Sequence, residues 1–497
     1  MIDVGEKNTG RARNEGSNKQ AKSFLLFIKQ FISGEFFIKD VPSYANSFWY
    51  SLGFLNMTCF FILLATGLTM VAFGPLWWDA NPLGVFVRSV HMWAAVAFLL
   101  FVCMHAFVVF STSGFKKPRR LIWVIGALML FIIAIQVEFG FGLRGDFGSQ
   151  YRALSAADFW NGNIIGHLFN VLDYSQLYGV HIALIPIILI VLIIIHFSLV
   201  KSHGLSTPYR KDIPYSMVRA DHKALFMRGT AAVAVILFLA LEFPSPFVPP
   251  VTIQWLAQTH PAMVAGTLVS ELNYSSGTAT YFDGIDPYTF NTRNVFVIVP
   301  YEQYMAASAG NNAATVFLSK NSTVQAADIS NAELYFENNG SISASMNLSN
   351  PVISMVGTLV VMAQSGLYQD ALMNGTHQYG NQTLTLRFLS DTGYIDQKAG
   401  ELGINLSDYG MVKDENGIPS SFLLAPVNYL DNTILQNDPN QDRDNGLFLG
   451  LLMLVVISVP VMPFLNELPD RLKLYRLFWN RFTIPEMRKA KRRKKAL

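Results

Sequence analysis

The sequence predicts an all-α polytopic membrane protein with a β-rich domain outside the membrane. Of its 497 residues, 51% are hydrophobic and 14% are charged, and the mean hydropathy of +0.31 is too high for an ordinary soluble protein. Six apolar runs are long enough to cross the ~30 Å hydrocarbon core of a bilayer. A long polar segment separates the fifth run from the sixth. The net charge is only +3, so we expect the lipid bilayer and no nucleic acid as a partner.

The apolar runs follow a polar N-terminus of mixed charge. Residues 1–23 form a polar cytoplasmic tail. Residues 24–47 contain "FLLFIKQFISGEFFIKDV", whose mixture of apolar and charged residues predicts an amphipathic helix on the membrane surface. The fifth run is short. It can cross the bilayer only if the flanking residues extend the helix or the neighbouring helices tilt. The six predicted spans are 48–73, 84–112, 120–141, 174–200, 228–243 and 446–465.

Basic residues determine the predicted orientation. The stretches "KKPRR" at 116–120, "KSHGLSTPYRK" from residue 201 and "RKAKRRKKAL" at the C-terminus lie on one side of a six-span topology. Basic loops remain in the cytoplasm, so both termini are expected inside. Residues 211–243 then form a cytoplasmic loop and the fifth span, and 466–497 form a basic cytoplasmic tail. A prokaryotic plasma membrane, and an archaeal one in particular, fits this pattern.

Residues 244–445 are expected outside the membrane as a glycosylated domain. Acidic residues outnumber basic ones there, and alternating runs such as "NVFVIVPY" and "TLTLRFL" favour β-strands. The apolar stretch "PVISMVGTLVVMA" is too short to cross a bilayer and is interpreted as the core of this domain. Glycosylation is predicted from Asn-x-Ser/Thr sequons at Asn273, Asn321, Asn339, Asn347, Asn374, Asn381 and Asn405.

Two predicted spans each carry two histidines. His91 and His105 are 14 residues apart in the second span, and His181 and His196 are 15 apart in the fourth. A helix rises about 21 to 22 Å over such a spacing, so two histidine pairs can meet across a bundle, one near each membrane surface. Each histidine could instead simply bind a neighbouring helix. Four at matched depths favour function, since paired imidazoles are the axial ligands of a six-coordinate haem.

Glycines repeat the same spacing. Gly53 and Gly67 in the first span are 14 residues apart, and so are Gly126 and Gly140 in the third. Glycine leaves room for a flat macrocycle against a flanking helix, although close packing of small residues is the alternative. Arg88 lies three residues before the first histidine of the second span, on the same face. It could bind a haem propionate, or extend to the membrane surface.

These motifs resemble the cytochrome b family of quinol-oxidising bc-type respiratory and photosynthetic complexes. The resemblance covers residues 48 to about 210, which would form a four-helix di-haem core. It includes "RSVH", the four histidines and the paired glycines. "SGFKKPRRLIWVIGA" and "HIALIPIILIVLIIIHFSLVKSHGLSTP" are most similar to the shorter cytochrome b of photosynthetic complexes. The chain would be a divergent member with a large extracytoplasmic insertion.

The resemblance implies two haems, quinol as substrate and transfer of electrons across the membrane. His91 and His181 would ligate the outer haem iron, and His105 and His196 the inner one. Haem b is expected, and a modified haem stays open. The implied partners are a Rieske iron–sulfur protein, other respiratory-complex subunits and quinone, and a homodimer stays open. The chain would then be the cytochrome b-like subunit of a quinol-oxidising oxidoreductase complex.

The sequence departs from the family at the outer quinol site. The Pro-Glu-Trp-Tyr motif is missing, and "PPVTIQWLAQ" places Gln254 near the position of its carboxylate. A glutamine cannot accept a proton. The acids that could replace it are Glu138, Asp146, Asp158 and Glu242. Two alternative functions remain: the haem subunit of a quinol oxidase supercomplex, and a non-catalytic membrane glycoprotein with structural histidines.

Overall fold

The computed structural model describes residues 39–161, 163, 168, 170–207, 215–280, 291–306, 312–338, 349–373, 380–405, 413–415, 422 and 425–479. The predicted tail of 1–23, most of the predicted surface helix of 24–47, and residues 480–497 lie outside this set. The described end of 24–47 does not form the expected amphipathic α-helix. It forms the strand β1 (Asp40–Pro42) and the 3-10 helix η1 (Ser43–Asn46). Pro42 has no N–H to donate to a helix, and β1 pairs antiparallel with β2 (Met217–Arg219).

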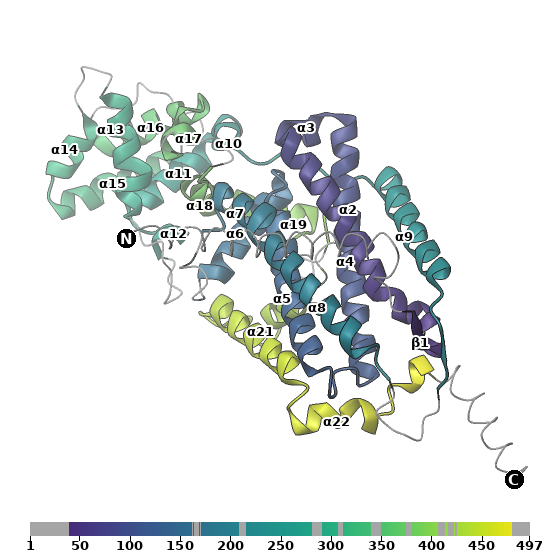
Figure 1. Ribbon diagram of the computed structural model, residues 1–497. Coiled ribbons are helices and arrows are strands. Elements are labelled where there is room, and N and C mark those ends of the chain that lie inside the picture. The colour runs from purple at the N-terminus through teal and green to yellow at the C-terminus, as the bar shows by residue number, and fades with distance from the viewer. Residues whose placement is uncertain are drawn as a thin grey trace, which may run out of the picture.

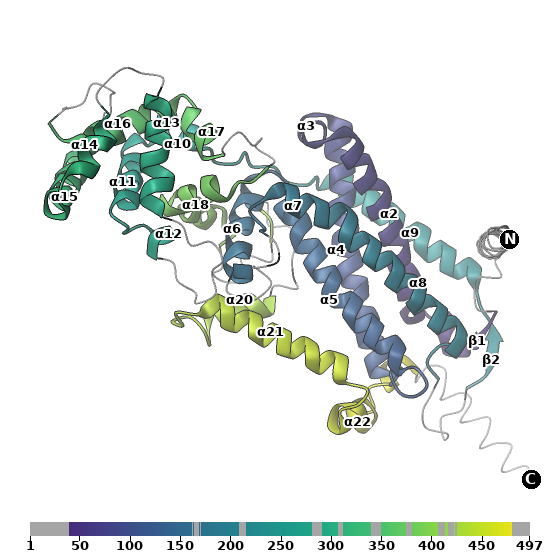
Figure 2. The same ribbon diagram turned by 60° about the vertical axis from the view of Figure 1, so that its left-hand side comes forward.

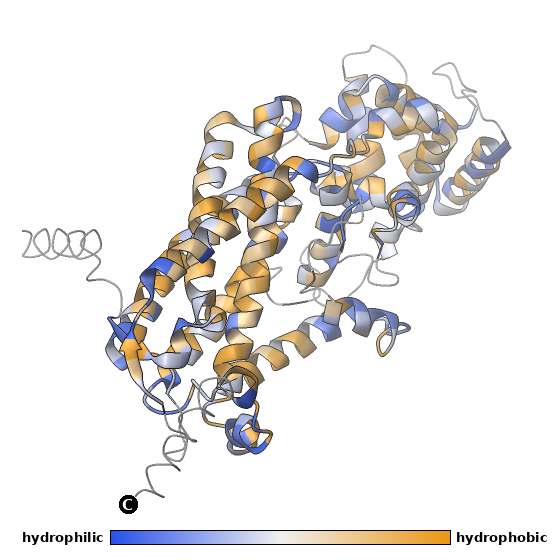
Figure 3. Ribbon diagram, turned by 90° about the vertical axis from the view of Figure 1, so that its right-hand side faces the viewer, coloured by the Kyte–Doolittle hydropathy of each residue, from blue (hydrophilic) through white to orange (hydrophobic). Residues whose placement is uncertain are grey.

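In the described part of the chain, five helices are long and apolar enough to cross a membrane. They form a bundle whose surface is largely apolar (Figures 1 and 3). The all-α polytopic prediction is confirmed for this region. The spans are η2 (Phe48–Ser51) with α2 (Leu52–Phe73), α4 (Pro82–Ser111), α5 (Arg120–Gly142), α7 (Tyr174–Gly179) with η4 (Val180–Leu184) and α8 (Ile185–His203), and α9 (His222–Glu242).

Side-chain caps set where several spans begin. Asn81 accepts hydrogen bonds from the backbone of Leu83 and Gly84, and Pro82 occupies the first turn of α4. Asp173 caps α7 and Asp221 caps α9 in the same way. In the bundle, α2 packs along α4, α5 packs along α8, and α9 lies against α2 and α4.

The sixth predicted span, 446–465, is not one continuous helix. The helix α21 covers Gln441–Ser458, and α22 (Pro463–Arg471) follows after a bend of 69°. Pro460 and Pro463 explain the break, because proline cannot donate the helical hydrogen bond. In Figure 2, α21 runs beside α5 toward α22. The hydroxyl of Ser113 donates to Asp470 over 3.0 Å, which holds α22 at that end of the bundle.

The accessory domain formed by residues 251–432 is helical, so the β-rich prediction is wrong. In the described residues, the only sheet is β1 with β2, and it lies elsewhere. The domain lies at the end of the bundle where α5 passes into α6 (Phe147–Asn161), called here the domain-side end (Figures 1 and 2). Its helices are α10 (Ile253–Thr259), α11 (Pro261–Leu272), α12 (Gly277–Thr280), η5 (Arg293–Ile298), α13 (Val299–Met305), α14 (Ala313–Ser319), α15 (Ser322–Asn338), α16 (Pro351–Gln364), α17 (Leu367–Leu372), α18 (Thr383–Asp391), α19 (Tyr394–Leu402) and α20 (Ala425–Asn432).

Burial on several sides explains the failed strand prediction. "NVFVIVPY" lies in η5 and α13, where Phe296, Val297 and Ile298 are consecutive and all buried. "TLTLRFL" lies in α18, where Leu386, Phe388 and Leu389 are buried. A short run that is buried on several sides has no diagnostic period, and tertiary packing then decides its structure. The stretch "PVISMVGTLVVMA" is α16, and most of its side chains are buried, as expected of a domain core.

The linker between α9 and α10 is attached to the bundle along its length. The carbonyl of Phe243 accepts from the indole of Trp93 over 2.8 Å, and the amide of Ser245 donates to Ser89 over 2.8 Å. Farther along, the side chain of Gln150 in α6 bonds both the N–H and the carbonyl of Val251. These contacts carry the chain across the domain-side end of the bundle.

A buried cluster of ion pairs joins the loop after α5 to the segment 413–415. Arg144 is 2.7 Å from Asp414 and 3.3 Å from Glu415, and it also pairs with Asp146. It donates to the carbonyl of Pro246 in the linker over 3.1 Å. Buried charges need such partners because isolated ones are costly to remove from water. Arg144 therefore ties the domain-side end of the bundle, the linker and 413–415 together.

Two carboxyl groups contact each other inside the accessory domain. Glu271 in α11 is fully buried, its carboxyl accepts from Ser276 over 2.6 Å, and it lies next to the carboxyl of Asp391 at the end of α18. Two carboxyl groups can share a hydrogen bond only when one of them is protonated. Burial, together with the adjacent Asp391, raises the pKa of Glu271 from its ordinary 4.5 to about 9.

We expect the accessory domain to lose stability as the pH rises. The proton on Glu271 stabilises the folded state fully below pH 4.5, and this stabilisation is lost as the pH rises through about 9. Glu271→Gln retains a hydrogen-bond donor and should flatten this dependence. Thermal unfolding of the purified protein across this pH range measures it, with the exposed Glu302→Gln as the matched control. A Glu271→Gln variant with the parental pH dependence would refute the protonated pair.

Candidate functional site

The structure brings the four histidines of the spans together in two pairs. His91 and His105 lie on α4, His181 lies in η4 and His196 in α8. The imidazoles of His91 and His181 interact electrostatically, and so do those of His105 and His196. The first pair lies toward the domain-side end, because His181 closely follows Tyr174, whose amide bonds to Gly380 of the accessory domain. The pairs that meet across the bundle are therefore the pairs expected from the matched depths.

A π-helical turn compensates for the unequal histidine spacings. The turn η4 (Val180–Leu184) contains His181, and the amide of Ile185 bonds to the carbonyl of Val180 five residues earlier. A π turn holds one more residue than an α turn. The 15-residue interval between His181 and His196 therefore covers nearly the same rise and rotation as the 14-residue interval on α4.

Proline and glutamine complete this turn. In the π pattern, the carbonyl of His181 would accept from the amide of residue 186, which is a proline without an N–H. The side chain of Gln136 in α5 donates to that carbonyl over 2.7 Å instead. In return, the Nδ1–H of His181 donates to the main-chain carbonyl of Gln136 over 3.0 Å. Gln136 thus orients both the ring and the backbone of His181.

Each of the four predicted glycines lies against one imidazole. A Cβ atom added to the glycine would lie within van der Waals distance of the Cε1 atom of that ring, or closer. These distances are 3.7 Å for Gly53 and His105, 3.4 Å for Gly67 and His91, 3.3 Å for Gly126 and His196, and 2.8 Å for Gly140 and His181. A methyl group at Gly140 would displace the adjacent ring and one at Gly126 would require a small shift, whereas at Gly53 and Gly67 it would make an ordinary contact.

The glycines also uncover the helix backbone. A helical side chain lies over the turn that precedes it, so glycine exposes the carbonyl four residues earlier. Gln136, which accepts from His181, is four residues before Gly140. His91 lies against the main chain of Leu63, four residues before its own glycine, and His196 lies against that of Ile122, also four residues before its glycine. An Nδ1–H bound to a carbonyl leaves the Nε2 lone pair free to ligate a metal.

Arg88 is held inside the domain-side end rather than extended to the membrane surface. It is 6% exposed, lies 2.6 Å from Asp79 in α3 (Pro75–Ala80), and donates to the carbonyl of Ser245 over 3.2 Å. Its guanidinium also covers the ring of Phe247. The buried Nε of Arg88 has no hydrogen-bond partner among the described residues. This N–H is therefore available to an anionic group.

Of the four candidate acids, two are held in ion pairs. Asp146 pairs with Arg144 and accepts from the backbone of Ser149 at the start of α6 over 2.9 Å. Asp158 lies 2.8 Å from Arg387 of α18. Because their charges are already compensated, neither carboxylate is well suited to exchange protons with a ligand.

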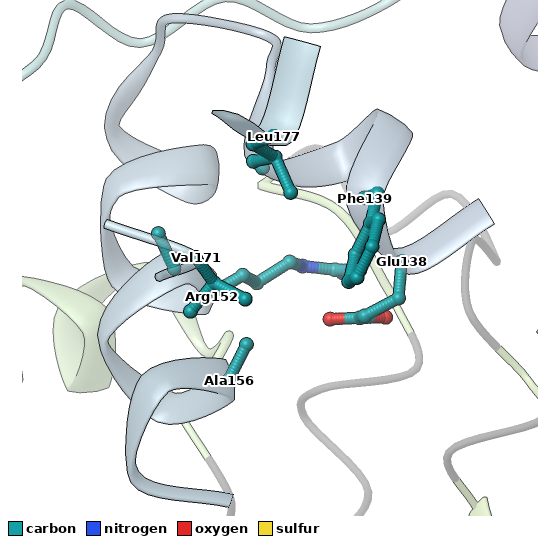
Figure 4. Close-up of a pocket in the computed structure, with 8 residues that line it drawn as sticks. Glu138, Phe139, Arg152, Ala156, Val171 and Leu177 are labelled. Carbon is teal, nitrogen blue, oxygen red and sulfur yellow. The ribbon is translucent and has the colours of Figure 1, made fainter. Parts of the chain in front are cut away.

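The other two candidates differ in their surroundings. Glu242 is exposed at the end of α9. Glu138 lines a cavity between α5 and α6 with Phe139, Arg152, Leu177 and others, with room for about one water molecule (Figure 4). Leu177 is four residues before His181, so the cavity adjoins the domain-side histidine pair.

Gln254 does not reach this cavity. It lies in α10 of the accessory domain, where its side chain donates weakly to the carbonyl of Gln364 over 3.4 Å. Sequence reasoning missed Gln136 and also Thr66, whose hydroxyl is 2.9 Å from Nδ1 of His91. Both are polar residues inside apolar spans, close in sequence to a predicted glycine. That pattern is the signal that could have identified them.

Comparisons with known proteins match the bundle. The family model described as cytochrome b (N-terminal)/b6/petB matches residues 96–264. Cytochrome b6 from Synechocystis sp. is 30% identical over 201 residues, which cover 36% of this chain and 90% of that protein. A solved structure titled hyperthermophilic respiratory Complex III aligns with a TM-score of 0.36 and 14% identity, covering 76% of this chain and 99% of that one.

We expect the role of Gln136 to depend on Pro186. Gln136→Met leaves the carbonyl of His181 without a donor and should lower the free energy of unfolding by about 1–3 kcal/mol. In a Pro186→Ala background, residue 186 regains an N–H that can donate to this carbonyl, so the same change should cost less. Thermal unfolding in detergent of the parent, both single variants and the double variant measures the difference. Equal costs in the two backgrounds would contradict this assignment.

Proposed function

The chain belongs to the cytochrome b family and is a cytochrome b-type subunit of a bc-type complex, and on this premise we propose that it carries electrons from quinol across the membrane through two haems. The observation that carries the proposal is the pairing of four imidazoles at two depths, between α4 and the span formed by η4 and α8. Each ring is backed by a glycine. Imidazole on both axial positions fits a low-spin haem, which supplies the redox chemistry when bound.

The residues that would hold the haems follow from the geometry. His91 and His181 would ligate the outer iron through Nε2, and His105 and His196 the inner one. The contacts of Nδ1 with Thr66 and with Gln136 would keep the rings of His91 and His181 oriented. The free Nε–H of Arg88 would suit a propionate, since its other donors already bind Asp79 and Ser245. The number and type of haem are part of this proposal.

We further propose that the accessory domain lies outside the cell and that both termini are cytoplasmic. Lys116, Lys117 and Arg119 lie in the loop between α4 and α5, and Arg120 begins α5. This loop is at the end of the bundle away from the domain (Figure 1), which favours a cytoplasmic location for that end. The expected partners are a Rieske iron–sulfur protein, other respiratory subunits and quinone.

Glycosylation of the accessory domain is part of the same proposal. Asn273, Asn321 and Asn381 are exposed, which suits modification of their sequons, and Asn405 is half-buried. Asn339, Asn347 and Asn374 lie outside the described residues.

Glu138 is the proposed proton acceptor for quinol at the outer site. It is the one candidate acid that lines a cavity beside the outer histidine pair. Quinol oxidation releases protons, and a carboxylate within reach of a water is a suitable acceptor. Arg152 lines the same cavity and is held by the carbonyl of Lys413 over 2.9 Å, so a positive charge stays next to the acceptor.

We expect each histidine pair to hold its own haem. His91→Ala should remove the outer haem and His196→Ala the inner one, because a six-coordinate iron loses one axial ligand. Reduced-minus-oxidised spectra and redox titrations of membranes measure both. His203→Ala, an exposed histidine at the end of α8, is the control and should keep both haems. If a pair variant retains both bands at parental potentials, the ligand assignment is wrong.

We expect neutralising Glu138 to slow quinol oxidation. Glu138→Gln removes the proton acceptor and should reduce the rate of quinol-dependent haem reduction about a hundredfold or more, measured with the inner quinone site blocked. Glu242→Gln is the matched control and should react at the parental rate. An unchanged rate in Glu138→Gln would mean that water or a partner subunit accepts the proton.

A further inference from the structure

One imidazole of the four has a side-chain hydroxyl next to its Nδ1 atom. The Oγ1 of Thr66 lies 2.9 Å from the Nδ1 of His91. Thr66 is the residue directly before Gly67, the glycine that contacts this ring. The residues before the other three glycines are apolar: Leu52, Phe139 and Ile125. The hydroxyl therefore distinguishes the domain-side pair from the far pair.

The hydrogen bonds of Thr66 determine which atom donates. Its hydroxyl donates to the carbonyl of Ile62 over 2.7 Å, with a longer contact of 3.3 Å to the carbonyl of Leu63. A hydroxyl has one proton, and the helix backbone takes it. Oγ1 must then accept from the Nδ1–H of His91. This selects the tautomer in which Nε2 carries the free lone pair.

We propose that Thr66 is a positioning residue that orients His91 and tunes the reduction potential of the haem it would bind. The inference rests on the proposed function, in which His91 ligates the outer haem. An acceptor on Nδ1–H makes an imidazole a stronger electron donor through Nε2, which stabilises the ferric iron. The bond from Thr66 to Ile62 polarises the hydroxyl and makes its oxygen a better acceptor. The hydroxyl thus lowers the potential of the outer haem.

The side-chain contact adds to the backbone contact of the same ring. His91 also lies against the main chain of Leu63, one turn before Gly67. Removing the hydroxyl therefore leaves one acceptor near Nδ1, as His181 has in the carbonyl of Gln136. We accordingly expect a changed potential rather than loss of the haem.

The experiment compares three substitutions in the full chain, in membranes. Thr66→Val has the same shape without the hydroxyl, and Thr66→Ser keeps the hydroxyl. Thr69→Val makes the same chemical change on α2, where the hydroxyl bonds only the carbonyl of Ala65 over 2.8 Å. Redox titration gives the potential of each haem, and electron paramagnetic resonance gives the ligand field of each ferric iron. The outer haem is the band missing in His91→Ala.

We expect Thr66→Val to shift the potential of the outer haem in the positive direction and to change its resonance spectrum, with the inner haem unaffected. Thr66→Ser and Thr69→Val should match the parent. An unchanged outer haem in Thr66→Val, or equal shifts of both haems, would overturn the proposal. If Thr66→Val does not accumulate, Thr66→Ala against Thr66→Ser makes the same comparison. A parent without haem bands would refute the proposed function instead.

Discussion

The position of His181 depends on an exposed main-chain carbonyl on the helix that flanks it. An imidazole inside an apolar bundle must satisfy its Nδ1–H, and a carbonyl within a helix is normally covered by the side chain four residues later. Glycine at that later position removes the cover. Gly140 does so for the carbonyl of Gln136, which accepts from His181 over 3.0 Å. Gly140 thus provides space for the ring of His181 and, with it, access to an acceptor.

This constraint extends along the fourth span. Because the ring of His181 is bound to α5, its backbone must adopt the register that places the ring there. The π turn η4 supplies the extra residue, and Pro186 leaves the carbonyl of His181 without its π-helical donor. Gln136 fills that position over 2.7 Å. The ring, the turn and the glutamine are therefore one unit, and a change in any of them alters the position of the imidazole.

Buried ion pairs hold the domain-side end of the bundle together. Arg144 gathers Asp146, Asp414 and Glu415, and Arg88 binds Asp79 and the linker. These pairs hold the accessory domain and the linker against the bundle, and they use up the charges of most nearby acids. Glu138 differs from those acids in lining a small cavity, together with Arg152, near the domain-side histidine pair.

The sequence by itself determined the membrane helices of the bundle and the shared register of histidines and glycines, because both follow from hydropathy and helical periodicity along one chain. It could not determine the fold of the accessory domain: "TLTLRFL" has the period of a strand, yet packing on several sides makes it α18. Nor could it show that Glu138 lines a cavity while Asp146 and Asp158 pair with Arg144 and Arg387, one of which is distant in the chain. The surroundings of a carboxylate depend on which residues lie near it in space, and only the tertiary structure decides that.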